Sequence, residues 1–417
     1  MVKNNERNTS YYKSKIEKSK RKKNDFFEKS RKRQMSSYIR AVAVVFVLVF
    51  LIIGFITLGV FLKNLTAEEY ETVVLPASEN REMAYVIPTG EDEPEESGGI
   101  GETFGRFQGV YLDVCKLDGL DDLQDFIDRI KSKDINAVVL DIKKDTGAVP
   151  FRIHGQFSAI TGEENEIDLK LRDVMDMLHA NDLYVSGRIV CFKDDLAGTS
   201  LVSYALTERD TGLRFIDIYG SAWLNIYSYG ARDYIKDLVM ESVQFGFNEI
   251  ILDYFYLPSI SNLSRLAYDD EGITRNDAVR SFILEVREVL RETAPGTKLG
   301  LNFPINNLFN MPNDSMGLYP DELIGVCDFF TTSFAPSELP QDALGISNPE
   351  TAPYETVKAL TANFIGLSDR IMLRPYIQAF DSEGGVVYGS DQILHQRQAL
   401  RESDIFVWTL LNYDNDY

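Results

Sequence analysis

The sequence predicts an α/β protein built as a (β/α)8 barrel of the TIM type, with one N-terminal transmembrane helix. Three observations carry this prediction: eight short apolar runs, amphipathic stretches between them, and 22 consecutive uncharged residues near the N-terminus. Strands that alternate with helices form parallel sheets, and near-continuous apolar strands indicate cover on both faces. Eight such strands favour a barrel over an open sheet.

The expected strands are rich in β-branched and aromatic residues. They span residues 109–115, 136–142, 183–192, 249–255, 298–304, 327–334, 371–380 and 405–411. The expected helices carry apolar residues at three- and four-residue spacing, and they span residues 123–133, 169–181, 234–246, 274–293, 353–366 and 390–402. Because only residues 412–417 follow the last strand, we expect a barrel that lacks its eighth helix.

The uncharged segment at residues 41–62 predicts a membrane anchor. A helix of this length reaches about 33 Å at ~1.5 Å per residue, which is enough to cross a ~30 Å hydrocarbon core. Residues 1–40 carry 14 basic and four acidic side chains, a net charge of +10, whereas residues 41–417 have a net charge of −31. Basic flanks stay in the cytoplasm. We therefore expect an uncleaved signal anchor in a single-pass membrane protein, with a cytoplasmic N-terminus and an extracytoplasmic barrel.

Two further segments flank the anchor. The basic tail, 1–40, is interpreted as a topology signal that also attracts anionic lipid, with an RNA- or protein-binding arm as the alternative. Residues 63–105 predict an acidic flexible stalk, because TGEDEPEESGGIGE (89–102) has almost no apolar residues to bury. The barrel then occupies residues 106–417. Its acidic charge repels phosphate backbones, so nucleic acid is excluded as a partner of the barrel.

Polar and aromatic side chains occur where the expected strands end, which is where the active site of a (β/α)8 barrel lies. Asp253 ends the fourth strand and is the expected nucleophile or base, with Asp141 or Asp194 as the second catalytic carboxylate. The expected substrate-binding residues are Arg188, Trp223, Tyr254, Tyr256, Asn302, Tyr376, Gln378 and Trp408. Carboxylate pairs cleave glycosidic bonds, flat rings stack on sugars and amides bind hydroxyl groups. These residue types together predict a sugar site.

Structural roles are the alternative for several of these residues. Asp253 could cap a helix or form a salt bridge in a loop. Asp141 could pair with Lys143 or with Arg188 on the adjacent strand. Trp223 and Trp408 are equally compatible with core positions.

Metal and cofactor chemistry has no support in the sequence. His154, His179 and His395 are scattered without the spacing of zinc ligands. No Walker A, GxGxxG or GxSxG pattern occurs in a strand–helix context. We therefore expect neither a metal nor a cofactor.

Several motifs occur in an order that points to a known family: GVYLDV, AVVLDIKKDTG, RIVCFKDDLA, AWLNIYSYGARDY, GFNEIILDYFYLPS and FVWTLLNY. Over residues 106–417 the chain resembles the putative glycosyl hydrolase barrel family, which was first catalogued as a domain of unknown function. That family is distantly similar to the α-amylase-like glycosidases. The resemblance implies a barrel, an extracytoplasmic location and action on a polysaccharide.

The chain departs from the family pattern at three positions. The fourth-strand motif of the family reads like FDYVRFPS, so Asp253 and Tyr254 are retained while Tyr256 replaces an arginine. Asn302 and Asn225 stand where the family carries aspartates. If either aspartate is the required acid or base, this chain cannot hydrolyse by the two-carboxylate route.

Two functions therefore remain open. The first is a membrane-anchored, extracytoplasmic glycoside hydrolase-like protein that acts on a polysaccharide through carboxylates at the strand ends. The second is a non-catalytic glycan-binding barrel that tethers or senses cell-envelope polymer. A second carboxyl group within about 10 Å of Asp253 is the feature that favours the enzyme.

Overall fold

The computed structural model describes residues 107–151, 170–268, 270, 272–305, 312–368 and 370–417. These residues all belong to one compact unit. The expected basic tail (1–40), membrane anchor (41–62) and stalk (63–105) lie outside the described residues. Within those residues, no helix has the length and apolar character needed to cross a membrane.

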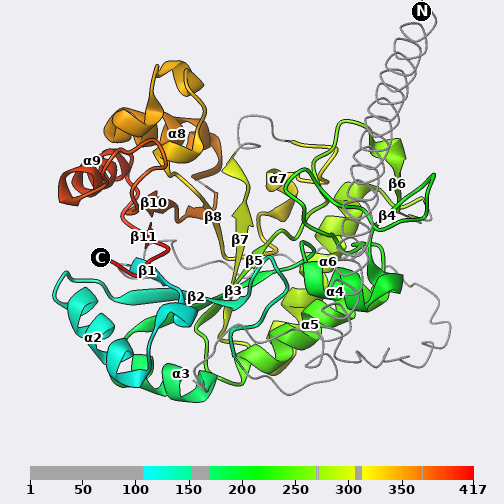
Figure 1. The fold of residues 1–417 in the computed structure, drawn as a ribbon, viewed down its shortest axis with the longest axis horizontal. Coiled ribbons are helices and arrows are strands. Elements are labelled where there is room, and N and C mark those ends of the chain that lie inside the picture. Colours follow the sequence, from blue (N-terminus) through cyan, green and yellow to red (C-terminus); the bar gives the residue numbers. More distant parts are fainter. Residues whose placement is uncertain (1–106, 152–169, 269, 271, 306–311, 369) are drawn as a thin grey trace, which may run out of the picture. The chain divides into compact units, whose positions relative to one another are not determined.

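A parallel sheet of nine strands forms the centre of the described unit (Figure 1). Its strands are β1 (Gln108–Leu112), β2 (Ala137–Lys143), β3 (Tyr184–Val190), β5 (Glu249–Asp253), β7 (Lys298–Phe303), β8 (Phe329–Thr332), β9 (Met372–Leu373), β10 (Tyr376–Gln378) and β11 (Trp408–Leu411). Their order is β10-β11-β1-β2-β3-β5-β7-β8-β9. Each of the eight predicted runs overlaps an observed strand, which confirms the predicted α/β class.

The two ends of this sheet come from one stretch of chain. Arg374 and Pro375 interrupt the seventh predicted strand and divide it into β9 and β10. The backbone N–H of Arg374 donates to the carbonyl of Phe330 in β8, while Thr409 of β11 donates to the carbonyl of Pro375. The sheet therefore curls back to its own beginning, as in TIM-like glycosidase folds. With β9 and β10 taken as one interrupted strand, it has the predicted eight positions.

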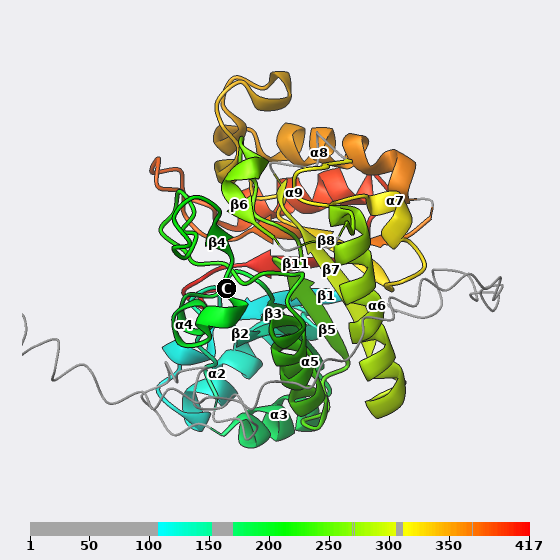
Figure 2. The same cartoon turned by 90° about the vertical axis from the view of Figure 1, so that its right-hand side faces the viewer.

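Helices follow the strands and surround the sheet (Figure 2). The long ones are α2 (Leu120–Lys131), α3 (Leu171–Ala180), α5 (Tyr229–Val243), α6 (Arg275–Thr293), α8 (Pro353–Ser368) and α9 (Ser390–Arg401), and they overlap the six predicted helices. The connections also contain α4 (Asp195–Ser200), α7 (Pro320–Leu323) and an antiparallel pair, β4 (Thr207–Glu208) with β6 (Leu266–Ala267). After β11, residues 412–417 form no helix, and the Tyr417 hydroxyl donates to the carbonyl of Tyr111 at 2.6 Å.

Local sequence explains where the helices begin and which face they bury. In α2, Leu123, Phe126, Ile127 and Ile130 are fully buried, which is the spacing of one helical face. Helix α6 is capped by Thr274, whose hydroxyl accepts the backbone N–H of Asp277. Such an N-cap satisfies one of the free N–H groups of the first turn.

Side chains from the strands fill the interior of the curled sheet. The central buried cluster consists of Phe107, Tyr111, Ala137, Val139, Ile251, Phe329, Tyr376 and Leu411. A buried ion pair joins Arg374 and Glu249. The guanidinium carbon of Arg374 lies 3.8 Å from the ring centre of Phe107 and 4.0 Å from that of Phe329. Because the interior is packed, a ligand site can form only at its end.

Candidate active site

A cavity of about 280 Å³ lies at the carboxyl ends of the strands. It is lined by Tyr111, Arg188, Asp253, Tyr254, Tyr256, Asn302, Phe303, Pro304, Ile305, Ser333, Glu338, Tyr376, Leu411 and Tyr413. Asp253, Phe303 and Leu411 are the last residues of their strands, so parallel strands place this set at one edge of the sheet. Six residues predicted from the sequence line the cavity: Arg188, Asp253, Tyr254, Tyr256, Asn302 and Tyr376.

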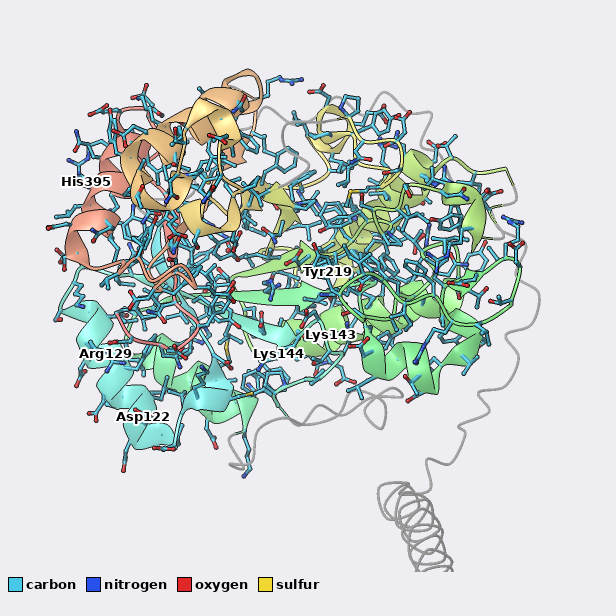
Figure 3. All side chains as sticks on the ribbon, turned by 45° about the horizontal axis from the view of Figure 1, so that its top comes forward. Asp122, Arg129, Lys143, Lys144, Tyr219 and His395 are labelled. Carbon is cyan, nitrogen blue, oxygen red and sulfur yellow. The ribbon has the colours of Figure 1, made fainter. Side chains whose placement is uncertain are left out.

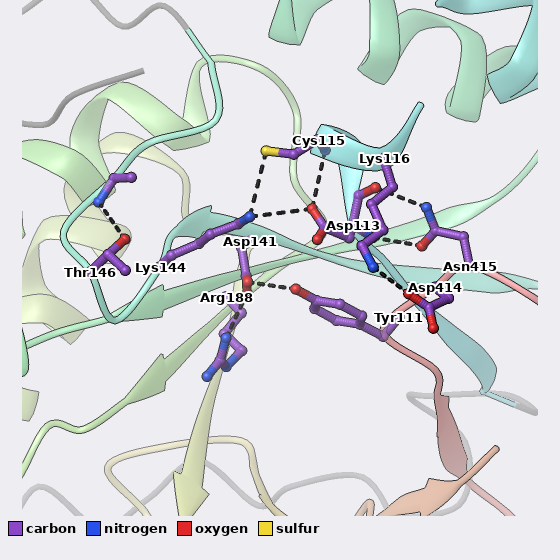
Figure 4. A network of polar contacts seen from close by, with 11 residues as sticks. Tyr111, Asp113, Cys115, Lys116, Asp141, Lys144, Thr146, Arg188, Asp414 and Asn415 are labelled. Carbon is purple, nitrogen blue, oxygen red and sulfur yellow. Dashed lines mark hydrogen bonds and ion pairs between the residues drawn. The ribbon is translucent and has the colours of Figure 1, made fainter. Parts of the chain in front are cut away.

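Arg188 in β3 connects one aspartate on each neighbouring strand, Asp141 within β2 and Asp253 at the end of β5. Its Nη1 donates to Oδ1 of Asp141 at 2.7 Å (Figure 4). Its Nε and Nη2 donate to Oδ2 of Asp253 at 2.9 and 2.7 Å. Burial alone would lower the pKa of Arg188, but the two carboxylates raise it well above the ordinary value. The pairing of Asp141 with Arg188, one of the open alternatives, is therefore present.

The register of the sheet explains this arrangement. Arg188 is paired with Asp141 across β2 and β3, and an irregularity follows in which Lys143 pairs with Ile189. A bulge of this kind changes the direction of the side chains beyond it. Asp141 also accepts the Tyr111 hydroxyl at 2.6 Å, and burial, followed by the Asp141 charge, raises the pKa of that phenol.

Asp253 occupies a sharp turn at the end of β5. Its Oδ1 accepts the backbone N–H of Tyr254 at 2.7 Å, and Tyr254 has φ of 46°, in the left-handed region. A bulky residue in this region costs of order 1–3 kcal/mol, and such strain concentrates at functional sites. The turn directs the next side chain, Tyr254, to the cavity while Asp253 stays bound to Arg188.

Aromatic rings form one wall of the cavity. Tyr254 and Tyr256 line it, with ring centres 5.7 Å apart, and Trp223 packs edge-on against Tyr254 at 5.7 Å. Trp223 is only 4% exposed, and its indole N–H donates to Asp217 at 2.9 Å. Trp223 therefore supports the wall from behind. The ammonium of Lys193 lies over the ring of Tyr254, 5.0 Å from the ring centre, and is paired with Asp145.

Two buried polar atoms in the cavity lack a hydrogen-bond partner among the described residues. They are Oδ1 of Asn302 and the hydroxyl oxygen of Tyr376. Leaving such an atom unpaired costs about 1–3 kcal/mol, so each is suited to a polar ligand. Burial raises the pKa of Tyr376, so this phenol stays a neutral donor and acceptor at physiological pH.

Glu338 also lines the cavity, although it was not among the residues predicted from the sequence. It ends a short 3-10 helix, Pro336–Glu338, in the connection after β8. Solvent reaches its side chain at the cavity mouth, but the protein around it raises its pKa, against a smaller lowering by Ser333. Glu338 lies six residues after the end of β8. A search for polar residues directly at strand ends therefore does not find it.

Five of the predicted residues do not line the cavity: Asp141 and Trp223, described above, and Asp194, Gln378 and Trp408. Asp194 is fully buried, pairs with Lys143 at 2.9 Å and caps α4 through the backbone N–H of Ala197. Figure 3 labels Lys143 and the adjacent Lys144, and the ammonium of Lys144 pairs with Asp113 at 3.4 Å. Protein groups in the interior bind both oxygens of Asp194. This side chain therefore caps α4 and cannot bind a ligand.

Gln378 and Trp408 are also held by the protein. Gln378 is fully buried and accepts the backbone N–H of Ser337 at 3.0 Å, so it fixes the segment that carries Glu338. Trp408 is 4% exposed and stacks under the guanidinium of Arg397 from α9 at 4.8 Å. It belongs to the packing between sheet and helix, which was the alternative to a sugar platform.

Asn225 likewise has a local role in its turn. Its amide nitrogen donates to the carbonyl of Tyr268 at 2.9 Å, and its Oδ1 accepts the backbone N–H of Tyr227 at 3.1 Å. The amide at position 225 thus fits its surroundings as a donor and acceptor. In the part of the chain that the structure covers, no group of three His, Cys, Asp or Glu side chains could hold a metal ion.

Comparisons with known proteins agree with this architecture. The family described as "Putative glycosyl hydrolase domain" matches residues 109–417. The glycoside hydrolase domain of PgaB (BpsB) from Bordetella bronchiseptica is 15% identical, with a TM-score of 0.57, over 75% of this chain and 95% of that chain. This likeness shows a shared fold.

Two further solved structures have lower TM-scores. A hypothetical protein from Ruminiclostridium thermocellum is 26% identical over 46% of this chain and 96% of its own, with a TM-score of 0.41. The glycoside hydrolase domain of PelA from Pseudomonas aeruginosa is 13% identical over 75% of this chain and 97% of its own, with a TM-score of 0.42. No curated protein sequence matches this chain.

Proposed function

The chain belongs to the family described as "Putative glycosyl hydrolase domain", and from that premise we propose that it hydrolyses glycosidic bonds in a polysaccharide. The fold that it shares with the Bordetella glycoside hydrolase domain supports this proposal. The residues that would act are those of the cavity at the strand ends. Asp253 is the proposed nucleophile or base, and Tyr254 and Tyr256 are the proposed sugar platforms.

The observation that carries the proposal is the combination of groups in one cavity. Carboxyl groups of Asp253 and Glu338, tyrosine rings, and the unpartnered polar atoms of Asn302 and Tyr376 line the same space. Glycosidases use a pair of carboxyl groups for cleavage and hydrogen bonds to hydroxyl groups for orientation. Asn302 stands where the family carries an aspartate, so it would bind the sugar and take no part in proton transfer.

A second candidate, glycan binding without cleavage, is favoured by the contacts of Arg188. This one guanidinium engages both Asp141 and Asp253, and each oxygen of Asp253 already accepts at least one hydrogen bond. A carboxylate held in this way is a weaker nucleophile than a free one. The two functions differ in a direct assay, because only the enzyme releases new reducing ends.

The first prediction concerns the charge of the ligand. We expect neutral or amine-bearing oligosaccharides to bind at least about tenfold more tightly than uronic acid oligosaccharides of equal length, a difference of about 1.4 kcal/mol. The reason is that Asp141 and Asp253 share the single cation Arg188, which leaves one uncompensated negative charge beside the cavity. Lys193 does not correct this balance, because it is paired with Asp145.

Calorimetric titration at low and high salt would check this preference, with reducing ends assayed in the same mixtures. The difference between ligands should shrink as salt screens the charges. Tighter binding of the uronic acid oligosaccharide would contradict the charge argument. Binding without new reducing ends from any glycan would favour the glycan-binding function over the hydrolase.

The membrane location is part of the proposal and depends on the sequence alone. We propose that residues 41–62 anchor the protein in a membrane, with residues 1–40 in the cytoplasm and the barrel outside, where a cell-envelope glycan would be its substrate. The asymmetry of charge between the two flanks supports this orientation.

Protease added to intact cells that express the full chain is expected to degrade the barrel and to spare the basic tail. Antibodies against an N-terminal tag and against the barrel would distinguish the two parts on a gel. In permeabilised cells both parts should disappear, which is the control for protease access. A barrel that survives in intact cells and is lost only after permeabilisation would reverse the orientation.

A further inference from the structure

Glu338 differs from the other carboxyl groups at the cavity in what surrounds it. Asp253 and Asp141 are both ion-paired with Arg188. Glu338 has no ion pair with a basic side chain anywhere in the described ranges. It lies in the cavity lining together with Ser333 and Tyr413, from the connections after β8 and β11.

We propose that Glu338 is the general acid of the site and donates a proton to the glycosidic oxygen of a bound polysaccharide. This assignment rests on the proposed hydrolase function. It gives Asp253 and Glu338 the two separate roles that glycosidic cleavage requires.

The contacts of Asp253 fit the opposite role. Its two oxygens accept three N–H groups, two from Arg188 and one from the backbone of Tyr254. These donors compensate negative charge on Asp253, and a proton there would displace one of them. Asp141 is engaged by Arg188 and by the Tyr111 hydroxyl, and it does not line the cavity. Glu338 is therefore the carboxyl group in the cavity that is best suited to carry a proton.

The surroundings of Glu338 support that protonation state. Desolvation by the protein around it raises its pKa above the ordinary value, while its bond to Ser333 lowers it by less. A general acid works best with a pKa near the working pH, and for a glutamic acid that requires an upward shift.

The backbone around Glu338 is fixed by side chains that are themselves buried or bonded. The Ser337 N–H donates to Oε1 of the fully buried Gln378, and the Ala335 N–H donates to the hydroxyl of Ser333. The N–H of Glu338 donates to the carbonyl of Ala335 at 3.1 Å. Gln378 is a positioning residue in this scheme, because it holds the segment and does not line the cavity.

The proposed step balances as an ordinary hydrolysis. The proton of Glu338 moves to the glycosidic oxygen, the bond from the anomeric carbon to that oxygen breaks, and its electron pair stays on the oxygen. Water supplies a new oxygen–carbon bond at the anomeric carbon. If configuration is retained, Asp253 first forms a bond to the anomeric carbon, water then displaces Asp253, and the proton that water loses returns to Glu338. If configuration is inverted, water attacks the anomeric carbon directly, and its proton returns to Glu338 through Asp253 and solvent.

The test compares Glu338→Gln with wild type on two substrates that share the sugar which wild-type protein cleaves. One carries an unactivated sugar leaving group, and the other carries 2,4-dinitrophenol, which leaves without acid assistance. We expect Glu338→Gln to lower kcat/KM by on the order of 10²–10⁴-fold on the first substrate and by less than about tenfold on the second. The fall of wild-type kcat/KM at high pH, where Glu338 loses its proton, should be absent from the variant.

Glu383→Gln is the matched control, since it removes one exposed glutamate outside the cavity lining and should leave both rates unchanged. Thermal unfolding of each variant verifies the fold. Equal losses on both substrates, or no loss on either, would overturn the assignment of Glu338 and leave the hydrolase function standing. If wild-type protein releases no reducing ends from any glycan, the hydrolase function fails and the assignment falls with it.

Discussion

Replacing Asp253 by asparagine is expected to lower kcat/KM for glycan hydrolysis by on the order of 10³-fold, the size of effect typical of a catalytic acid or base. Asparagine keeps the shape of the side chain, and its single oxygen can accept either from Arg188 or from the Tyr254 N–H, while its NH2 group takes the place of the other oxygen. What it removes is the negative charge that would attack or stabilise the anomeric centre. The substitution therefore separates charge from packing.

The measurement is the rate of reducing-end release, taken together with glycan affinity from the same preparations. Asp391→Asn is the matched control, because Asp391 is exposed in the first turn of α9 and lies outside the cavity lining. Affinity should change by less than about tenfold, since Tyr254, Tyr256 and Asn302 remain. Equal hydrolysis by Asp253→Asn and wild type would remove Asp253 from the mechanism.

A partial loss of activity in Asp253→Asn would be explained by the contact that Arg188 keeps with Asp141. Arg188 still pairs with Asp141 when Asp253 is neutral, so the guanidinium keeps one anionic partner at 2.7 Å. The net charge at this edge of the sheet then becomes less negative by one. A variant that binds uronic acid oligosaccharides better than wild type, but cleaves nothing, would support both the catalytic role of Asp253 and the charge preference of the cavity.

The sequence predicted the fold well because its periodicity is strong. Runs such as NAVVLDI and EIILDYF are nearly all apolar up to an aspartate, which is the pattern of a strand buried on both faces with a polar end. Those two runs became β2 and β5, and their aspartates meet at Arg188. What periodicity could not show is the break at Arg374 and Pro375, since a proline tolerates both strand edges and turns.

The candidate site was harder to predict, since a polar residue at a strand end can either line a ligand site or bond to other protein groups in the interior. Asp194 and Asp253 look similar in sequence: Asp253 directly follows an apolar run, and Asp194 follows one after Lys193. The two aspartates differ in that Asp194 pairs with Lys143. This lysine is 51 positions before Asp194 in the chain and reaches it only in the folded sheet. Glu338 was missed for the related reason that its loop, and not its strand, brings it to the cavity.

A large effect on stability is expected at Arg374, which does not line the cavity. Replacing Arg374 by methionine should lower the free energy of unfolding by about 3–5 kcal/mol, the usual cost of removing one partner of a buried ion pair. Arg374 is 1% exposed and Glu249 is fully buried. Without the guanidinium, Glu249 would keep only the hydroxyl groups of Ser186 and Tyr184 as donors.

Urea unfolding of the full chain, followed by the fluorescence of the buried Trp223 and Trp408, would measure this loss. The control is the double variant Arg374→Met with Glu249→Gln, in which no unpaired charge remains in the interior. Because most of the cost of the single change is the stranded carboxylate, the double variant should recover a large part of the lost stability. A single variant within about 1 kcal/mol of wild type would mean that water or a rearranged side chain compensates Glu249. If the double variant is less stable than Arg374→Met alone, the charge of Glu249 is secondary. The guanidinium then stabilises the fold mainly through the two rings that flank it, Phe107 and Phe329.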